Sequence, residues 1–137
     1  MTKPEPSEHV EPTGEVAIRT IAMPADTNVN GDIFGGWLMS QMDLAAGTVA
    51  HRRARSRVAT VAVDSMSFIH PVFVGDQVTL YARVVSTGRT SMRIFVEAWR
   101  RARMDANSQK VTEATFVFVA IGEDRRPMAL PDEPAPG

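Results

Sequence analysis

Cysteine is absent from the 137 residues, which excludes a disulfide framework, a thiolate nucleophile, an iron–sulfur cluster and a cysteine-ligated zinc site. Long apolar runs are absent as well, because no stretch approaches the run of about 20 apolar residues that a membrane helix needs. The first residues, MTKPEPSEHVEPTGE, lack the hydrophobic segment of a signal peptide. We therefore expect a cytoplasmic protein with no membrane partner.

An excess of charge of either sign is also missing. Fifteen Lys and Arg residues stand against sixteen Asp and Glu residues, for a formal net charge of -1. This balance lacks the basic surplus of proteins that bind phosphate backbones, so we expect no nucleic-acid partner. Hydrophobic residues make up 44% of the chain and charged residues 23%, which is typical of a globular protein and excludes a collagen-like or wholly disordered chain.

Proline is scarce in the middle of the chain and gathers at its ends. Residues 1–14 contain three prolines and residues 125–137 contain four, with little else in either stretch that a core could bury. Both stretches are typical of flexible tails. Residues 15–124 contain no linker, repeat or low-complexity tract, and their length predicts a single domain.

Hydrophobic periodicity divides this domain into one helix and five strands. Alternation over residues 16–23 predicts a strand that ends before Pro24. Residues 34–53 are rich in Met, Leu, Ala and Gln without proline, which predicts a helix of about 20 residues. β-Branched, alternating patterns predict four more strands, at residues 58–69, 77–85, 91–99 and 111–121. This order predicts an α+β fold in which one long helix packs on an antiparallel meander.

One acidic residue stands out in the predicted helix. Asp43 shares a small, apolar helix face with Gly36 and Gly47. It is also the only charged residue between Phe34 and Ala50, so no Lys or Arg of the helix can neutralise it there. Burying such a carboxylate is costly unless it is hydrogen-bonded, neutralised or used. Two interpretations remain open: a structural acceptor at a subunit contact, or a general base or nucleophile beside a cleft.

The segment NGDIFGGW places two glycines at the start of the same helix. The backbone N–H groups of Gly35 and Gly36 have no acceptor within the helix and lie at the positive end of its dipole. Such groups can stabilise the oxyanion of an acyl-transfer step. A tight turn explains a double glycine equally well.

Four blocks of the sequence, in this order and spacing, resemble the hotdog-fold acyl-CoA thioesterases: MPADTNVNGDIFGGWLMSQMDLAAG, RVATVAVDSMSFIHPVFVGDQV, STGRTSM and VTEATFVFVA. The likeness is to the YciA-like branch related to brain acyl-CoA hydrolase and covers about residues 18 to 121. It implies a hotdog fold, a long central helix wrapped by an antiparallel β-sheet. It also implies hydrolysis of acyl-CoA to CoA and a free acid at a subunit interface.

The resemblance assigns roles to four residues at the reaction centre. In the family pattern the carboxylate of the MSQMD block, here Asp43, is catalytic, and the polar residue of the NGD block, here Asp32, lies in the facing part of the site. Some relatives carry Asn at the Asp32 position, so a turn-capping role for Asp32 remains an alternative. Asp43 would act as general base on water or as nucleophile, while the N–H of Gly35 or Gly36 holds the thioester oxygen. Neither a cofactor nor a metal is required.

The phosphates of CoA need hydrogen-bond donors. The segment GRTS offers Arg89, Thr90 and Ser91 at a strand start, where relatives seat CoA, although an ordinary hairpin is an open alternative. Asn28 could hold the loop over the site or simply stabilise a turn. A second basic cluster could serve the phosphates or be a solvated helix end, and consists of Arg52, Arg53, Arg55 and Arg57.

The resemblance also implies self-association, with at least a dimer as the working unit and a trimer of dimers as the expected hexamer. Asp64 shares the alternation phase of Thr60 and Met66, which predicts that it faces a partner subunit or the cleft. Two other functions remain alternatives: a non-catalytic sensor that binds CoA or an acyl chain, and a dehydratase or hydratase of acyl thioesters.

The three histidines bear on the last alternative. His9, His51 and His70 are too scattered in the sequence to predict a metal site. A dehydratase of this fold pairs a histidine with a carboxylate, and no histidine is close in sequence to the glycine-rich helix start. This separation favours the thioesterase.

Overall fold

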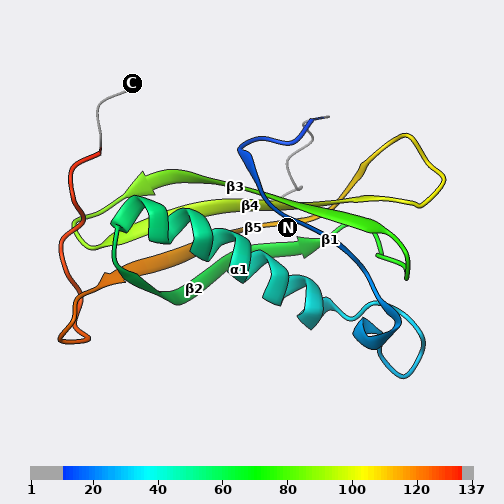
Figure 1. The fold of residues 1–137 in the computed structure, drawn as a ribbon, viewed down its shortest axis with the longest axis horizontal. Coiled ribbons are helices and arrows are strands. Elements are labelled where there is room, and N and C mark those ends of the chain that lie inside the picture. The colour runs from blue at the N-terminus through cyan, green and yellow to red at the C-terminus, as the bar shows by residue number, and fades with distance from the viewer. Residues whose placement is uncertain (1–10, 134–137) are drawn as a thin grey trace, which may run out of the picture.

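The computed structural model describes residues 11–133, in which one long helix packs against a five-stranded antiparallel sheet (Figure 1). A single 3-10 turn, η1 (Pro24–Asp26), precedes the long helix α1 (Gly35–Ala54). All five predicted strands are present, as β1 (Glu15–Ile21), β2 (Arg57–Phe68), β3 (Gln77–Thr87), β4 (Ser91–Arg101) and β5 (Gln109–Ile121).

The strands lie across the sheet in the order β1-β3-β4-β5-β2. β3, β4 and β5 form an antiparallel meander, but the prediction that β2 begins the same meander is wrong, because β2 pairs with β5. The reason lies in burial. β3, β4 and β5 carry side chains that are completely buried, whereas β2 is half-buried or exposed throughout. The strands that bury most apolar surface take the centre of the sheet, and β2 is left at its edge.

α1 lies across one face of the sheet, along its length (Figure 1). Small residues on its buried face bring it close to the sheet, and the core between them is apolar. Arg55, in the left-handed conformation, ends the helix by donating its backbone N–H to the carbonyl of His51. The buried residues of α1 are Trp37, Leu38, Met42, Ala45, Ala46, Val49, Ala50 and Ala54. In the part of the chain described, no helix is both long and apolar enough to cross a lipid bilayer.

Parts of both predicted tails are packed against the domain. At the C-terminal end, Met128 donates its backbone N–H to Ala120, and Leu130 does so to Arg89, both at 2.9 Å. The side chains of Met128 and Leu130 pack against the core. The prediction of a free tail is therefore wrong for this stretch, because two apolar side chains and backbone hydrogen bonds anchor it. Residues 1–10 and 134–137 of the predicted tails lie outside the described residues.

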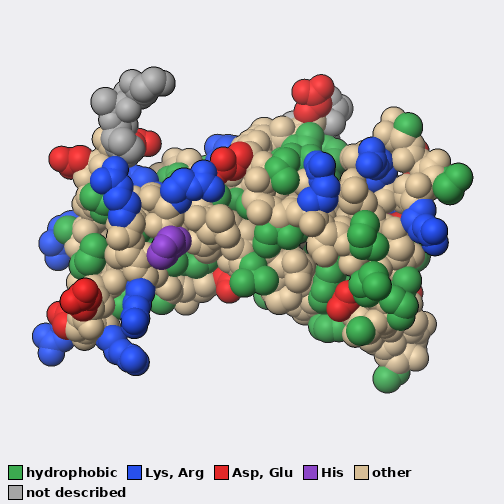
Figure 2. Space-filling model, viewed as in Figure 1, with side chains coloured by type: hydrophobic (Ala, Val, Ile, Leu, Met, Phe, Trp, Pro, Cys, Tyr) green, Lys and Arg blue, Asp and Glu red, His purple; other side chains and the backbone are tan. Residues whose placement is uncertain are grey.

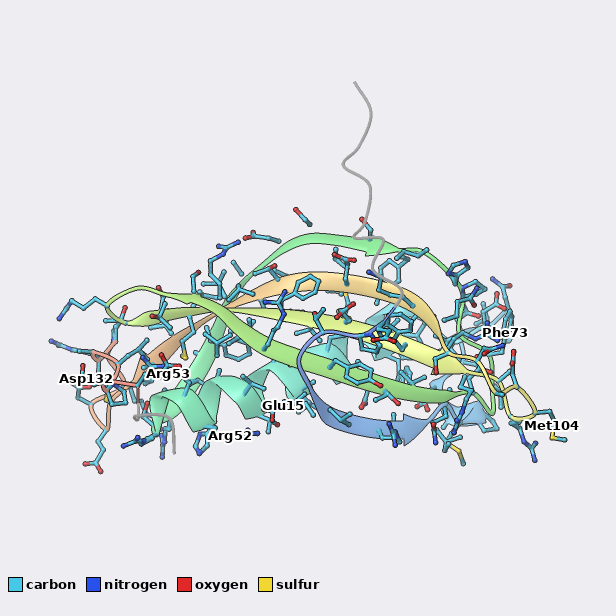
Figure 3. The ribbon with its side chains drawn as sticks, turned by 90° about the horizontal axis from the view of Figure 1, so that it is seen from above. Glu15, Arg52, Arg53, Phe73, Met104 and Asp132 are labelled. Atoms are coloured by element: carbon cyan, nitrogen blue, oxygen red, sulfur yellow. The ribbon has the colours of Figure 1, made fainter. Side chains whose placement is uncertain are left out.

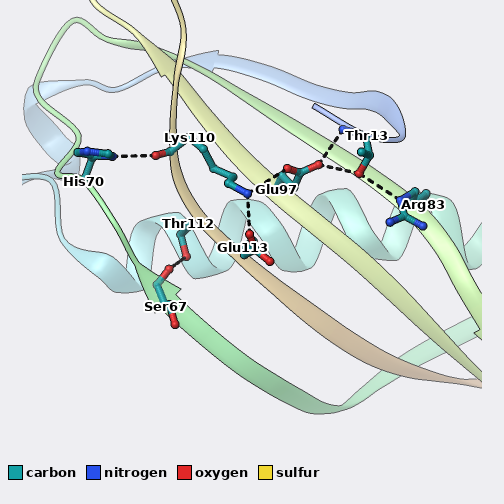
Figure 4. A network of polar contacts seen from close by, with 8 residues as sticks. All are labelled: Thr13, Ser67, His70, Arg83, Glu97, Lys110, Thr112 and Glu113. Carbon is teal, nitrogen blue, oxygen red and sulfur yellow. Dashed lines mark hydrogen bonds and ion pairs between the residues drawn. The ribbon is translucent and has the colours of Figure 1, made fainter. Parts of the chain in front are cut away.

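The N-terminal stretch is anchored by a polar cluster on the sheet face opposite α1 (Figure 4). Glu97 is completely buried and accepts hydrogen bonds of 2.8 Å from both the backbone N–H and the hydroxyl of Thr13. Glu113 lies directly opposite Glu97 on β5. Lys110 lies between the two carboxylates, with its Nζ 2.6 Å from Glu113 and 3.7 Å from Glu97. This cation offsets the repulsion that two opposed buried carboxylates would create.

Candidate active site

Asp43 lies in the middle of α1, half-buried, where the helix crosses the edge strand β2. The hydroxyl of Thr60 on β2 donates a hydrogen bond of 2.6 Å to Asp43 Oδ1. Among residues 11–133 no cation forms an ion pair with Asp43. The carboxylate is therefore held in one orientation by a neutral donor, and its second oxygen remains available for a further partner.

The start of α1 offers unpaired backbone donors. Phe34 is the N-cap residue and makes no side-chain capping hydrogen bond, and the first helical residues are Gly35 and Gly36. By helix geometry their N–H groups have no acceptor within the helix. A Cβ at Gly35 would lie 3.1 Å from the ring of Phe68, and one at Gly36 would lie 3.3 Å from the ring of Phe34. The two glycines thus allow aromatic rings to approach the helix start closely.

Asp43 and the glycine N–H groups are separated along the helix. Asp43 follows Gly36 by seven positions, which corresponds to a rise of roughly 10 Å along the helix. One small substrate group cannot contact both at hydrogen-bond distance. In a single chain the structure therefore does not bring Asp43 together with Gly35 and Gly36, although all three lie on the same helix.

The loop before α1 has a clear internal architecture. Asn28 Oδ1 accepts the backbone N–H groups of Asn30 at 2.9 Å and of Asp32 at 3.1 Å. Asn28 therefore stabilises the turn, which is the second of the two roles considered for it from the sequence. The Asp32 side chain is exposed, and no hydrogen bond of its carboxylate occurs within residues 11–133. The turn is capped by Asn28 and not by Asp32.

Arg89, Thr90 and Ser91 lie at the other end of the molecule from Gly35. The carbonyls of Arg89 and Thr90 accept backbone N–H groups from Leu130 and Ala120, so the C-terminal stretch holds this hairpin. Ser91 begins β4, where Met92 is buried toward α1, so Ser91 faces the opposite side of the sheet. Within one chain these residues do not meet Asp43.

Basic side chains gather at the end of the molecule where α1 ends, and hydrophobic ones at the end where it begins (Figure 2). Two arginines of the second basic cluster already have partners. Arg52 forms a 2.7 Å ion pair with Glu15, and Arg53 donates to the carbonyl of Pro131 at 2.7 Å (Figure 3). These contacts are typical of a solvated helix end. The other two arginines of the cluster, Arg55 and Arg57, line a cavity together with Ser56.

A cavity of about 480 Å³ opens between the start of α1 and the end of β2. Its lining includes His70, whose Nδ1–H donates to the carbonyl of Lys110 at 3.0 Å. The expectation that no histidine is near the glycine-rich helix start is therefore wrong, because the chain after β2 folds back to that point. No pattern in the sequence predicts this contact, because His70 and Gly35 are 35 positions apart. The residues lining the cavity are Ile33, Phe34, Gly35, Leu38, Phe68, Ile69, His70, Pro71 and Val72.

Two further residues of the candidate site, Thr60 and Phe68, are likewise not predictable from sequence patterns. In the sequence, Thr60 is distinguished only by its alternation phase, and Phe68 only by its place in a predicted strand. Thr60 lies next to Asp43, and Phe68 next to Gly35, only because the chain folds β2 against α1. No group of three or more His, Cys, Asp or Glu side chains that could hold a metal ion occurs in the described part of the chain.

The model of the thioesterase superfamily matches residues 30–106, from the loop before α1 to beyond the end of β4. An uncharacterized acyl-CoA thioester hydrolase of Zymomonas mobilis is 56% identical over 131 residues, which cover 96% of this chain and 88% of that protein. The acyl-CoA thioester hydrolase YciA of Escherichia coli K12 is 50% identical over 128 residues, covering 91% of this chain and 97% of YciA. The chain belongs to the thioesterase superfamily. Within it, the chain is a YciA-like acyl-CoA thioester hydrolase, which confirms the resemblance seen in the sequence.

Solved structures of this family share the fold. A hexameric broad-specificity acyl-coenzyme A thioesterase, solved as a mutant with alanine in place of one aspartate, matches with a TM-score of 0.84 at 45% identity. That match covers 88% of this chain and 89% of the other. A hexameric hotdog-fold thioesterase of Campylobacter jejuni matches with a TM-score of 0.81 at 36% identity, covering 86% and 91%. The helix on its antiparallel sheet is therefore a hotdog fold, as predicted.

Proposed function

We propose that the protein hydrolyses acyl-CoA to CoA and a carboxylic acid, with Asp43 as the catalytic carboxylate. One observation carries the proposal: in a chain of this hydrolase family, a half-buried carboxylate is oriented by Thr60 at 2.6 Å and has no cation as partner among the described residues. Such a carboxylate can remove a proton from water as it attacks the thioester carbonyl. Direct attack by Asp43 on the carbonyl remains the alternative.

The N–H groups of Gly35 and Gly36 are the proposed donors to the thioester oxygen. Donors of this kind act only when they lie about 3 Å from the developing oxyanion, and the base must lie within about 3 Å of the water. Because roughly 10 Å of helix rise separates Gly36 from Asp43 in one chain, we assign the two parts of one site to different subunits. Asp32, exposed before α1, belongs to the half that carries the glycines.

The edge of the sheet supports self-association. β2 has a neighbour on one side only, β5, and Val61 on this strand is 58% exposed. Leu44, on α1 next to Asp43, is 59% exposed. A long edge strand with exposed apolar side chains favours pairing with another strand. We propose that a second copy pairs along β2, and that three such dimers form a hexamer like those of the solved relatives.

The remaining parts of the proposal concern the CoA moiety and the setting. Arg89, Thr90 and Ser91 are the proposed donors to CoA phosphates, reached from another subunit, and Asn28 acts by shaping the loop beside the helix start. The reaction needs no cofactor or metal, because a carboxylate and backbone N–H groups supply the base and the oxyanion donors. We place the enzyme in the cytoplasm.

Thiol release from a series of substrates between acetyl-CoA and palmitoyl-CoA tests the proposal. We expect hydrolysis of several members by the wild type, and a loss of at least a hundredfold in kcat for Asp43→Asn, as removal of a general base produces. Asp64→Asn is the matched control, because Asp64 is paired with Arg93 at 2.6 Å on the opposite face of the sheet. Analytical ultracentrifugation of each variant checks that assembly is intact.

Each outcome has a distinct meaning. Equal activity of wild type and Asp43→Asn would show that Asp43 is structural, as the first sequence alternative held. Binding of CoA without thiol release from any substrate would indicate a sensor module. A stable monomer with full activity would contradict the assignment of one site to two subunits.

A further inference from the structure

The cavity between α1 and β2 is lined mostly by apolar side chains. Two of its lining residues, Leu38 and Val72, are almost completely buried and belong to the hydrophobic core. Its rim carries large apolar side chains that remain exposed, with Phe68 at 53% and Phe34 at 41%. Aromatic rings exposed around an apolar cavity mark a binding site more often than a structural defect.

The cavity is continuous with the unpaired donors of the helix start. Gly35 lines the cavity and is also the first residue of α1, whose N–H has no helical acceptor. The ring of Phe68 lies against this glycine, since a Cβ there would be 3.1 Å from the ring. A carbonyl oxygen held by the Gly35 N–H would therefore have its carbonyl carbon at the cavity mouth, beside the Phe68 ring.

We propose that this cavity binds the first carbons of the acyl chain and that Phe68, as its wall at Gly35, sets the discrimination by chain length. The inference rests on the proposed function, because it places the thioester carbonyl at Gly35. The cavity volume is about 480 Å³, far above the roughly 15 Å³ that one water-sized group needs, so the cavity has room for several methylene groups. His70 is the polar member of the wall, and its Nδ1–H is satisfied by Lys110.

The energetic consequence is a regular dependence of binding on chain length. Each buried methylene contributes about 0.8 kcal/mol, which corresponds to a roughly fourfold change in affinity. Non-hydrolysable S-alkyl-CoA thioethers from S-ethyl to S-hexyl isolate this effect, because the CoA part is constant. We expect the Kd from titration calorimetry to fall roughly fourfold for each added methylene.

Three variants locate the effect. Phe68→Ala removes the wall, and we expect the increment to fall below about twofold for each methylene. Ile33→Trp fills the cavity, and we expect S-hexyl-CoA to lose at least tenfold in affinity while S-ethyl-CoA changes little. Phe73→Ala is the matched control: Phe73 is exposed to a similar degree, at 48%, but stacks on Arg100 outside the cavity. It should keep the wild-type increment.

The inference is overturned if the Kd of the wild type does not fall with each added methylene. It is also overturned if Phe68→Ala and Ile33→Trp, folded and assembled like the wild type, both keep the wild-type fall in Kd. Because Ile33→Trp fills the cavity and leaves Phe68 in place, it decides the matter should Phe68→Ala not fold. Thiol release separates this result from the proposed function. Hydrolysis without an increment refutes the cavity alone, whereas an increment without hydrolysis supports the cavity and refutes the thioesterase.

Discussion

Thr60 on the edge strand β2 donates a hydrogen bond of 2.6 Å to Asp43 on the central helix. The contact joins the middle of α1 to β2, one of the two edge strands of the sheet. It therefore places the proposed catalytic carboxylate at the boundary between the core of one subunit and the surface that a second subunit would cover. A change at Thr60 alters the orientation of Asp43 without removing its charge.

Thr60→Val is expected to lower kcat about tenfold with little change in KM, because a hydrogen bond to a charged group contributes about 1.5 kcal/mol. Thr60→Ser keeps a hydroxyl and should keep most of the activity. Steady-state kinetics on one good acyl-CoA substrate measures both. If Thr60→Val equalled the wild type in kcat, orientation by Thr60 would be irrelevant to turnover.

Arg89→Ala is expected to raise KM for acyl-CoA roughly fivefold and to leave kcat nearly unchanged, because the lost contact is to the CoA phosphates and not to the thioester. The effect should shrink as salt rises, since phosphate contacts are screened. Arg103→Ala, an exposed arginine beside another cavity, is the control. Identical KM values for Arg89→Ala and wild type at low salt would remove Arg89 from the CoA site.

Lys110→Met is expected to destabilise the protein by about 3 to 5 kcal/mol, because it leaves the buried Glu97 and Glu113 opposed without the cation between them. Arg52→Met, which breaks the exposed pair with Glu15, should cost less than about 1 kcal/mol. Urea unfolding at a single protein concentration compares the two. Equal losses would mean that burial does not govern the strength of these pairs.

Gly47→Ala is expected to stabilise the protein by about 0.5 to 1 kcal/mol, because alanine is the better helix former. The structure leaves room for the methyl group, since a Cβ at Gly47 would lie 3.6 Å from the ring of Phe118. The urea midpoint should rise. A fall would show that another subunit approaches α1 at Gly47 more closely than Phe118 does.

Much of the fold followed from the sequence because local periodicity reports local structure. The alternation of β-branched residues located all five strands, and the proline-free run located α1 to within one residue at each end. The family blocks added the hotdog architecture and the prediction that Asp43 is catalytic. Each of these inferences needs only residues that are near in sequence, or a pattern shared with relatives.

Pairing between distant segments was decided by the tertiary structure alone. Register shifts in β2, between Thr60 and Ala62 and between Asp64 and Ser67, change which side chains share a face. Asp64 consequently pairs with Arg93 on the outer side of the sheet, although simple alternation placed it in phase with Thr60. A bulge inserts a residue without any change of composition, so no periodic pattern reveals it.

The sequence by itself determined the elements, the family and the lone carboxylate of the helix. Only the tertiary structure placed β2 beside β5, Thr60 against Asp43, and Phe68 and His70 beside Gly35. The physical reason is that the burial of apolar surface depends on all segments of the chain together. The strands with the most apolar surface take the centre of the sheet. β2, left at one edge of the sheet, carries Thr60 of the proposed site.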